Sequence, residues 1–411
     1  MKFSRLRCSK HLPIYVATTI FVITFLVYYS TSPSDAVWKF TKRDYYNYFV
    51  WLADAFLHGR LHLEEALPNL RELVTFNGRF YIIYPPMPAI LLMPFVAIWG
   101  TSFSQDLASL IIGSLNVSLV YLIMRRLTHD SRIQIWMTLL FGFSTVNWWL
   151  ATMNGPWYFA HVTSFLFLSL AIYETLTNQR LFLIGLLLGA SYWTRLNTIL
   201  SMPFFMIMLA DKWLLGSAKD SMLKRINFKP LIQLCLGVGI FVLLNFTYNF
   251  LRFGTPFDVA YTMLETPNPF FTEGPFSLSY IPSHLYVLFV KTPVFMSESP
   301  YIVPSVWGMS ILITTPAIIY SIFAGIRNRV SLACWLGIVP VALLLFLKGG
   351  TGWPQFGYRY AMDFLPFWLL LIFKGIGSEV KWDHKTLICI GILWNLWGVI
   401  FINKFAWFEW W

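Results

Sequence analysis

The sequence predicts an all-α integral membrane protein, and three observations support this fold class. Of the 411 residues, 57% are hydrophobic and only 12% are charged, whereas soluble domains carry about 25% charged residues. The mean hydropathy is +0.62. The apolar stretches are long and continuous rather than alternating, which argues against a membrane β-barrel. A polytopic helical protein remains, and each of its spans needs about 20 apolar residues.

The formal net charge is +11, from 30 Lys and Arg against 19 Asp and Glu. In a membrane protein such a basic excess orients the chain in the bilayer, because loops rich in Lys and Arg stay on the cytoplasmic side. The sequence has no nucleic-acid-binding motif, so no nucleic-acid partner is expected. The four cysteines form no CxxC pattern and imply no disulfide framework.

The first ten residues carry four basic side chains, and residues 12–34 then contain no charged side chain. This stretch is longer than the apolar region of a secretory signal, so we expect an uncleaved first span with a cytoplasmic N-terminus. Ten further spans bring the expected total to eleven. They are residues 107–124, 133–152, 158–177, 181–194, 196–210, 230–251, 307–326, 330–347, 360–375 and 386–403.

Charge placement decides two doubtful segments. If residues 86–99 crossed the membrane, Arg125 and Arg126 would lie outside, so a short interfacial or re-entrant helix is expected there. The two runs around Arg195 are short for spans, and one long helix with a buried arginine is the alternative. Two passes keep the basic residues of 212–229 inside, so two passes are expected.

The first long loop, 31–106, is predicted to contain two ordered features. Residues 44–58 carry an apolar stripe at helical spacing and a second, more polar stripe, which is typical of a helix lying in the membrane interface. Asn77-Gly78 separates two apolar, β-favouring runs, which predicts a hairpin with a type I′ turn. A second long loop covers about 252–306 on the same side of the membrane.

Three acids of the first loop are candidates for catalysis. Asp44 begins the amphipathic helix, close to both water and lipid, where a carboxylate could take a proton from an acceptor. The alternative is a capping box that starts at Thr41 and has Asp44 as its third helical residue. Asp54 and Glu72 are the other two candidates, and the alternatives for them are a solvated helix face and a strand end.

Two arginines and one histidine are candidates for substrate contact at the outer boundary. Arg195 and Arg359 are each flanked by apolar spans, and a guanidinium suits a phosphate because its donors form a fixed fork. The alternatives are snorkelling for Arg195 and pairing with Asp363, four residues on, for Arg359. His161 lies near the outer end of a span. No histidine shows metal-ligand spacing and no phosphate-binding loop occurs, so no tightly held metal and no nucleotide are expected.

The order of these features resembles the polytopic GT-C glycosyltransferases, particularly the bacterial relatives of protein O-mannosyltransferases and lipid A aminoarabinose transferases. The matching features are one span, an external loop with an Asp at an amphipathic helix, Tyr84-Pro85-Pro86, a span ending in Arg-Arg, and a Thr-Arg break. The resemblance covers residues 12–212, with a looser echo at 357–360. The family often has Asp-Glu where this chain has Asp44-Tyr45.

The resemblance implies transfer of a sugar from a polyprenyl- or dolichyl-phosphate donor to a lipid, glycan or protein acceptor on the extracytoplasmic face of the plasma (inner) membrane. Asp44 would be the catalytic acid, with Glu72 and Asp54 as substitutes. By its position, Arg195 would contact the lipid phosphate. Arg359, His161 and Tyr84 are also expected to contact substrate, and a loosely bound divalent cation could assist the leaving phosphate. A transporter or flippase of lipid-linked sugars and a non-catalytic membrane scaffold remain as alternatives.

The expected organisation is one polytopic domain over 1–411. It divides into a GT-C-like core, 12–212, with the external loop 31–106, and a region of additional spans, 213–411, with the external loop 252–306.

Overall fold

The computed structural model describes residues 12–33, 46–66, 72–153, 155–215, 226–263 and 270–406. Six of its helices are long and apolar enough to cross a membrane. They are α1 (Leu12–Thr31), α5 (Gln105–Leu127), α8 (Pro156–Leu176), α13 (Phe228–Phe253), α16 (Arg329–Leu347) and α18 (Trp382–Phe405).

Shorter apolar helices complete the bundle, and the chain is an integral membrane protein of all-α class. The eleven predicted spans remain a prediction, because several of them are short or broken. The shorter α-helices are α3 (Tyr48–Leu57), α4 (Met87–Trp99), α6 (Ser131–Phe143), α7 (Asn147–Thr152), α9 (Leu181–Tyr192), α10 (Met202–Met208), α11 (Ala210–Trp213), α14 (Ile281–Phe289), α15 (Ile311–Thr314) and α17 (Leu365–Ile376).

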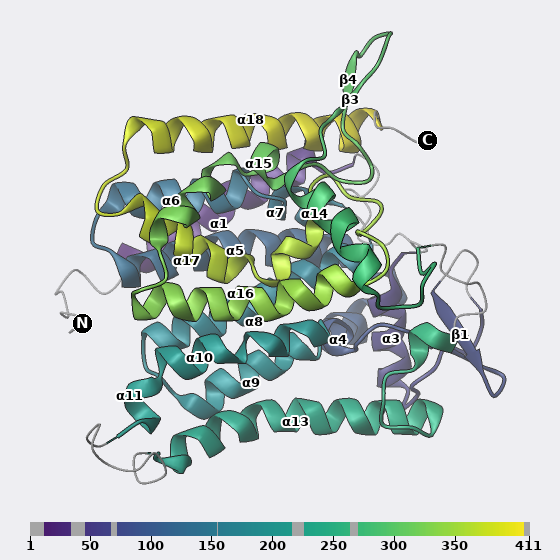
Figure 1. Ribbon diagram of the computed structural model, residues 1–411. Helices are drawn as coiled ribbons and strands as arrows, with labels where there is room; N and C mark the ends of the chain where they lie inside the picture. The colour runs from purple at the N-terminus through teal and green to yellow at the C-terminus, as the bar shows by residue number, and fades with distance from the viewer. Residues whose placement is uncertain are drawn as a thin grey trace.

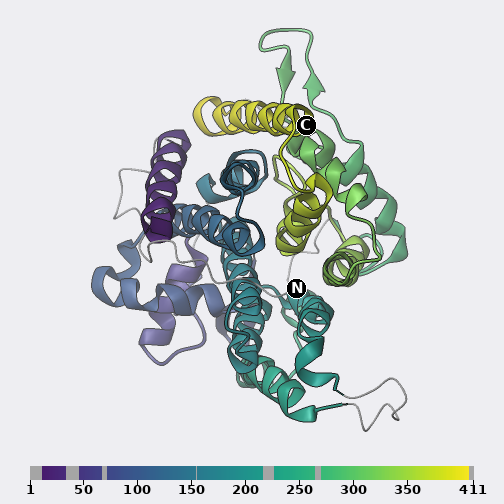
Figure 2. The ribbon, with the colours of Figure 1, turned by 90° about the vertical axis from the view of Figure 1, so that its left-hand side faces the viewer.

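The long helices run side by side across Figure 1, with α8 inside the bundle and α13 and α18 at its edges. Helix α8 is buried along most of its length, whereas α13 exposes Leu236, Leu243 and Leu251. Apolar side chains on an outer helix suit contact with lipid tails. Figure 2 shows the bundle from one end, with the purple N-terminal part at the left and the green part of the chain at the right.

The two long loops that are predicted to be external lie at one end of the bundle, which we call the loop end: it carries the described residues 46–66, 72–84, 255–263 and 270–306. In Figure 1 this is the right-hand end. The end of α1 is tied there to the end of α18, since the Lys404 ammonium donates to the Ser32 carbonyl. The opposite end carries Arg126, which donates to Tyr173, and the end of α11, where the Trp213 carbonyl accepts from the Asn227 N–H. The two loops therefore share a face, as predicted.

Several predicted spans are broken rather than continuous. The span at 133–152 is divided into α6 and α7 at Ser144–Val146, where the Thr145 hydroxyl donates to the Phe141 carbonyl. The span at 307–326 consists of α15 and a 3₁₀ helix, η5 (Pro316–Ala324). Proline lacks the backbone N–H that would continue the preceding helix. Apolar composition predicted each segment but could not predict its break.

The chain turns back at Arg195, which excludes one long helix there, and the two membrane passes remain a prediction. Helix α9 ends at Tyr192, and a 3₁₀ helix, η2 (Leu196–Ser201), leads back into α10. Helix α9 also packs closely on α13. A Cβ on Gly185 would lie 2.2 Å from the Leu234 carbonyl oxygen, so the two backbones approach closely because of a residue without a side chain.

The predicted hairpin is present as β1 (Leu73–Phe76) and β2 (Arg79–Ile82). The strands are antiparallel, with Phe76 opposite Arg79. Asn77 and Gly78 both have positive φ, 51° and 71°, as a type I′ turn requires. The sequence pattern thus predicted both the strands and their turn.

Helix α3 runs nearly at right angles to the long helices in Figure 1, as expected of an interfacial helix. It begins at Tyr48, four residues later than predicted, and is preceded by Asn47. The proposed capping box of Thr41 and Asp44 lies outside the described residues. Helix α4 does not cross the bundle. The next helix, α5, begins beside α3 at the loop end, where the Phe49 N–H donates to the Gln105 side chain.

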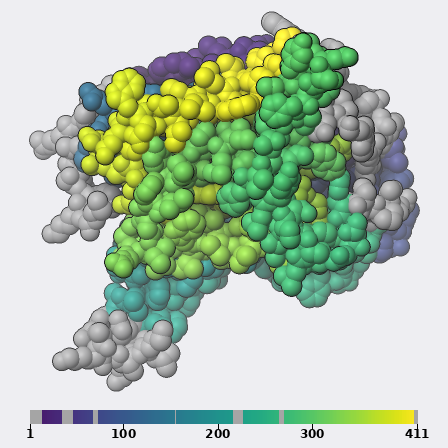
Figure 3. Space-filling view, turned by 45° about the horizontal axis from the view of Figure 1, so that its top comes forward, coloured from purple at the N-terminus to yellow at the C-terminus, as the bar shows by residue number. Residues whose placement is uncertain are grey.

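The second loop contains η3 (Ala260–Met263), η4 (Leu278–Tyr280), α14 and a small hairpin that the sequence did not predict. The hairpin pairs β3 (Val294–Phe295) with β4 (Ile302–Val303) and projects beyond α18. In Figure 3 this loop forms a continuous green band of side chains that starts beside α18 and runs over the face in view. The 3₁₀ helices η1 (Gly100–Ser102) and η6 (Arg359–Asp363) complete the structure.

Candidate active site

The candidate site lies at the loop end of the bundle and is organised by the first turns of α8. Gly155 has a φ of 140°, and a Cβ there would lie 2.9 Å from the Trp157 ring. Pro156 then occupies the first turn, where its missing N–H costs nothing. The side chains of Trp157, Tyr158 and His161 therefore leave one helix end toward three different parts of the site.

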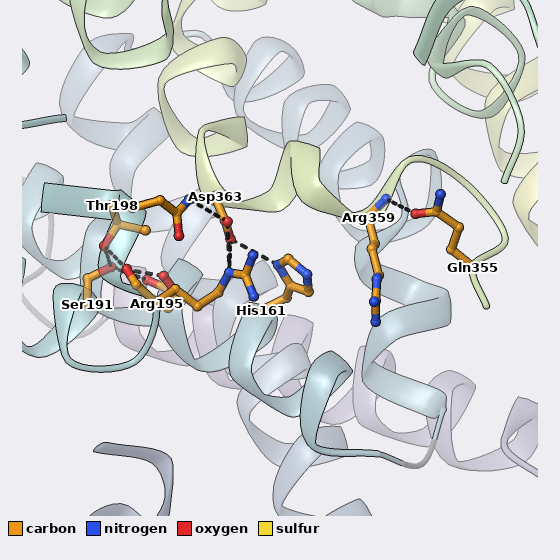
Figure 4. A network of polar contacts seen from close by, with 9 residues as sticks. His161, Ser191, Arg195, Thr198, Gln355, Arg359 and Asp363 are labelled. Carbon is orange, nitrogen blue, oxygen red and sulfur yellow. Dashed lines mark hydrogen bonds and ion pairs between the residues drawn. The ribbon is translucent and has the colours of Figure 1, made fainter. Parts of the chain in front are cut away.

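A closed polar cluster surrounds Asp363, whose side chain is fully buried. Its carboxylate accepts from Arg195 Nε at 2.6 and 2.7 Å and from Asn197 Nδ2 at 2.7 Å. His161 Nδ1 lies 2.9 Å from the same carboxylate. Figure 4 shows these side chains converging on Asp363 from α8, η2 and η6. The charge of Asp363 is thus matched by an arginine and further hydrogen bonds, as a buried charge requires.

Arg359 lies apart from this cluster and has an unsatisfied guanidinium. It is 5% exposed, and its Nε and Nη1 atoms have no hydrogen-bond partner among the described residues. Its backbone N–H donates to Gln355 Oε1 at 2.9 Å, which fixes the main chain but leaves the charge unmatched. The guanidinium lies 5.5 Å from the ring centres of Tyr158 and Tyr360.

Lys348 is the second cation of this region. It directly follows α16, and its ammonium lies 5.3 Å from the Tyr360 ring centre and 5.4 Å from that of Tyr261. Arg359 and Lys348 therefore share the Tyr360 ring between them. Such cation–π contacts contribute about 0.5–2 kcal/mol, but they provide no counter-charge.

Glu72 is the acid of the site. Its carboxylate accepts from the Trp157 indole N–H at 2.8 Å, which ties the start of β1 to the start of α8. Burial raises the pKa of Glu72 to about 7, while the Trp157 hydrogen bond and the charges of Arg359 and Lys348 act in the lowering direction. A carboxyl with this pKa exchanges protons near neutral pH.

The remaining predicted residues are less closely tied to this region. Tyr84 is buried against Tyr48, and its hydroxyl has no hydrogen-bond partner among the described residues. Tyr48 in turn packs near Trp157. Asp54 is partly exposed and contacts His58 at 3.7 Å on its own helix. Asp44 lies outside the described residues.

The alternative role for Arg359, an ion pair with Asp363, is wrong. That pairing assumes an α-helix, on which residues four apart lie on one face. Residues 359–363 instead form the 3₁₀ helix η6, which has three residues per turn, so the two side chains diverge. Asp363 pairs with Arg195, whose side chain is only 16% exposed, so Arg195 does not snorkel as a free cation.

Sequence reasoning missed three residues that shape the site: Lys348, Trp157 and Asp363 in its role as the partner of Arg195. Only Lys348 carried a usable signal, since it is a charge placed between an apolar span and the glycine-rich segment Gly349-Gly350-Thr351-Gly352. The 168 residues that separate Arg195 from Asp363 hide their pairing from any local pattern.

No protein-family model and no curated sequence matches the chain. Among solved structures it is similar to ArnT from Cupriavidus metallidurans bound to undecaprenyl phosphate, with 13% identity and a TM-score of 0.49. It is also similar to the oligosaccharyltransferase AglB from Archaeoglobus fulgidus in complex with an inhibitory peptide and a dolichol-phosphate, with 14% identity and a TM-score of 0.45.

These similarities cover 92% and 97% of the chain, but only 62% of ArnT and 56% of AglB. The chain thus spans about three fifths of the length of either solved protein.

Proposed function

We propose that the chain is a membrane glycosyltransferase that moves a sugar from a polyprenyl- or dolichyl-phosphate donor to an acceptor on the extracytoplasmic face. The observation that carries the proposal is the buried, unpaired guanidinium of Arg359 beside Lys348. A buried cation without a counter-charge is costly, and a phosphate supplies both the charge and the hydrogen-bond acceptors that Arg359 lacks.

The chemistry follows from this arrangement. An acceptor hydroxyl or amine attacks the anomeric carbon, and the bond from that carbon to the phosphate oxygen breaks. The polyprenyl phosphate leaves with the electron pair, and its charge is stabilised by Arg359 and Lys348. The acceptor proton passes to a carboxylate of the first external loop.

Two carboxylates are proposed for this proton. Asp44 is supported by the resemblance of its loop to the GT-C glycosyltransferases, and Glu72 is supported by its pKa of about 7. Asp54 ranks third, because its described contact is with His58 alone. Arg195 and His161 hold Asp363 rather than a free charge, so we assign them to positioning the site, and Tyr84 offers its free hydroxyl to substrate.

The described residues do not provide a metal site. Within the described ranges, no three His, Cys, Asp or Glu side chains are gathered to hold a metal ion. A loosely bound divalent cation therefore remains an accessory of the proposal, and no step depends on it. Transfer measured with and without a chelator tests that accessory separately.

Binding of undecaprenyl phosphate to the detergent-solubilised chain tests the proposed function. Arg359→Ala should weaken binding more than Arg359→Lys, because both lose the fork but only the former loses the charge. Lys348→Ala should also weaken binding. Parental affinity in all three variants would contradict a phosphate site here.

The two acids are separated by asparagine and glutamine variants. Asp44→Asn and Glu72→Gln keep the shape of the side chain but remove the base, which typically costs about 10²–10⁴-fold in rate. The variant at the true base should bind lipid phosphate normally and transfer almost no sugar. Thr41→Ala, which removes only the predicted cap, should keep most activity.

The orientation is part of the proposal: the N-terminus is cytoplasmic and the loop end faces outward. In a background without the four cysteines, single cysteines at Glu65 and Ser279 should react with an impermeant reagent added to whole cells. Cysteines at the exposed positions Lys212 and Lys229 should react only after the membrane is opened. The reverse labelling pattern would invert the assignment.

A further inference from the structure

The second external loop is attached to the segment that carries Lys348. The Ser277 N–H donates to the Leu347 carbonyl at 2.8 Å, and the Gly349 N–H donates to the Pro275 carbonyl at 3.0 Å. Phe276 and Lys348 lie opposite each other in a single antiparallel bridge. Residues 275–277 therefore hold the main chain on both sides of Lys348.

The same loop sends one fully buried histidine, His284 of α14, between the two cation-bearing segments. Its Nε2 lies 2.8 Å from the Lys348 carbonyl oxygen, and its Nδ1 lies 2.7 Å from the Tyr358 hydroxyl. Tyr358 is itself buried and directly precedes Arg359. The His284 ring thus connects Lys348 to Tyr358, the residue that precedes Arg359.

The carbonyl fixes the tautomer of His284. A carbonyl oxygen only accepts, so Nε2 carries the hydrogen and donates it to Lys348. In the neutral ring Nδ1 then accepts from the Tyr358 hydroxyl. Burial lowers the pKa of His284, and the charge of Lys348 acts in the same direction, against the hydrogen bond to the Lys348 carbonyl. The neutral ring satisfies both partners at once.

We infer that His284 is a positioning residue that sets the spacing between Lys348 and Arg359, so that the second external loop forms part of the donor-phosphate receptor. This inference rests on the proposed function of those two cations. A phosphate held by two cations on separate segments binds tightly only when their spacing matches its oxygens. His284 contacts the main chain and a neighbour of these cations, and it touches no substrate.

Binding of undecaprenyl phosphate to the full chain in detergent tests this role. His284→Ala should weaken binding about tenfold, and His284→Gln, whose amide can still donate to the Lys348 carbonyl, should recover part of that loss. Tyr358→Phe removes the second bond and should weaken binding about threefold. Combining His284→Ala with Tyr358→Phe should add nothing to His284→Ala alone, because both remove the same hydrogen bond.

The matched control is Tyr280→Phe. Tyr280 is a buried loop residue whose hydroxyl donates to the Gly274 carbonyl and accepts from the Glu273 N–H, with no described contact to Lys348 or Tyr358. It should lower the unfolding temperature like the His284 variants but leave lipid-phosphate affinity unchanged. Equal affinity losses in Tyr280→Phe and His284→Ala, or parental affinity in His284→Ala, would overturn the inference.

Arg359→Ala in the same assay separates a failure of the proposed phosphate site from a failure of the positioning role of His284. If it binds as the parent does, the proposed phosphate site fails. If it loses binding while the His284 variants do not, only the positioning role fails.

Discussion

Arg195 and Arg359 lie at the same end of the bundle, Arg359 buried and Arg195 partly buried, yet their surroundings differ. Arg195 donates to the fully buried carboxylate of Asp363, which also contacts His161 and Asn197. Arg359 has two donor atoms without a partner among the described residues. The first arginine belongs to a closed network, whereas the second lacks such partners, which is why we propose it as the phosphate contact.

The difference teaches which buried charges to associate with stability and which with binding. A matched buried pair is costly to break, because removing one partner leaves the other uncompensated. An unmatched buried cation lowers stability on its own, and a ligand of opposite charge removes that cost. The five predictions that follow test this contrast, from the largest expected effect to the smallest.

Asp363→Asn should have the largest effect on stability. It leaves the Arg195 charge uncompensated inside the protein, and breaking such a buried pair costs about 3–5 kcal/mol. The measurement is the unfolding temperature in detergent, together with the amount of protein in the membrane. Asp211→Asn is the control, because Asp211 pairs with Arg329 at the same 2.6 Å distance but is 83% exposed. Exposed pairs contribute little, so a similar loss in both variants would contradict the contrast.

Arg359→Met should show the opposite pattern. It removes an unmatched buried cation and keeps an apolar stem, so the unfolding temperature should stay at or above the parental value. Lipid-phosphate affinity should fall about 10- to 100-fold, since hydrogen bonds to charged groups contribute about 1.5–3 kcal/mol. Arg195→Met should lose stability instead. A marked loss of stability in Arg359→Met would mean that the guanidinium is already satisfied in the free protein.

The pKa of Glu72 predicts the pH dependence of transfer, if Glu72 is the base. With a pKa of about 7, the deprotonated fraction rises from about 10% at pH 6 to about 90% at pH 8, so the rate should rise about tenfold. Arg359→Met should move this rise to higher pH, because the cation lowers the pKa. A parental profile that stays flat between pH 6 and pH 8 would assign the proton to another acid.

The contribution of Glu72 to stability should fall as the pH rises, opposite to its effect on the transfer rate. The folded chain holds the Glu72 proton more tightly than the unfolded chain, whose pKa is about 4.5. The contribution of Glu72 to the free energy of unfolding is therefore largest below pH 4.5 and is lost as the pH rises to about 7. Glu72→Gln should remove this dependence.

Gly352→Ala should have the smallest effect, and it should affect binding only through Arg359. Gly352 has a φ of 104°, and a Cβ there would lie 2.9 Å from Arg359 Nε. The strained backbone costs about 1–3 kcal/mol, and the added methyl group displaces the guanidinium. Gly377→Ala is the matched control, because its φ is 81° with nothing within 4 Å. Both should lose stability, and only Gly352→Ala should weaken lipid-phosphate binding.

The sequence by itself determined the membrane class, the turn of the chain at Arg195, and the β1–β2 hairpin. Each of these depends on information within about 20 residues: apolar length, charge placement, or the Asn77-Gly78 turn. The same local information identified Arg195, Arg359, His161 and Glu72 as candidates, because charged and polar groups are rare at the boundary of apolar spans.

Only the tertiary structure decided what each candidate contacts. Asp363 pairs with Arg195 rather than with Arg359. Lys348 and Arg359 both contact the Tyr360 ring, and Glu72 accepts a hydrogen bond from Trp157. These contacts join residues up to 168 positions apart, and the pair of Arg195 and Asp363 crosses the predicted boundary at residue 212. A local pattern describes one helix or one turn, whereas the partner of a buried charge is set by which helices pack together.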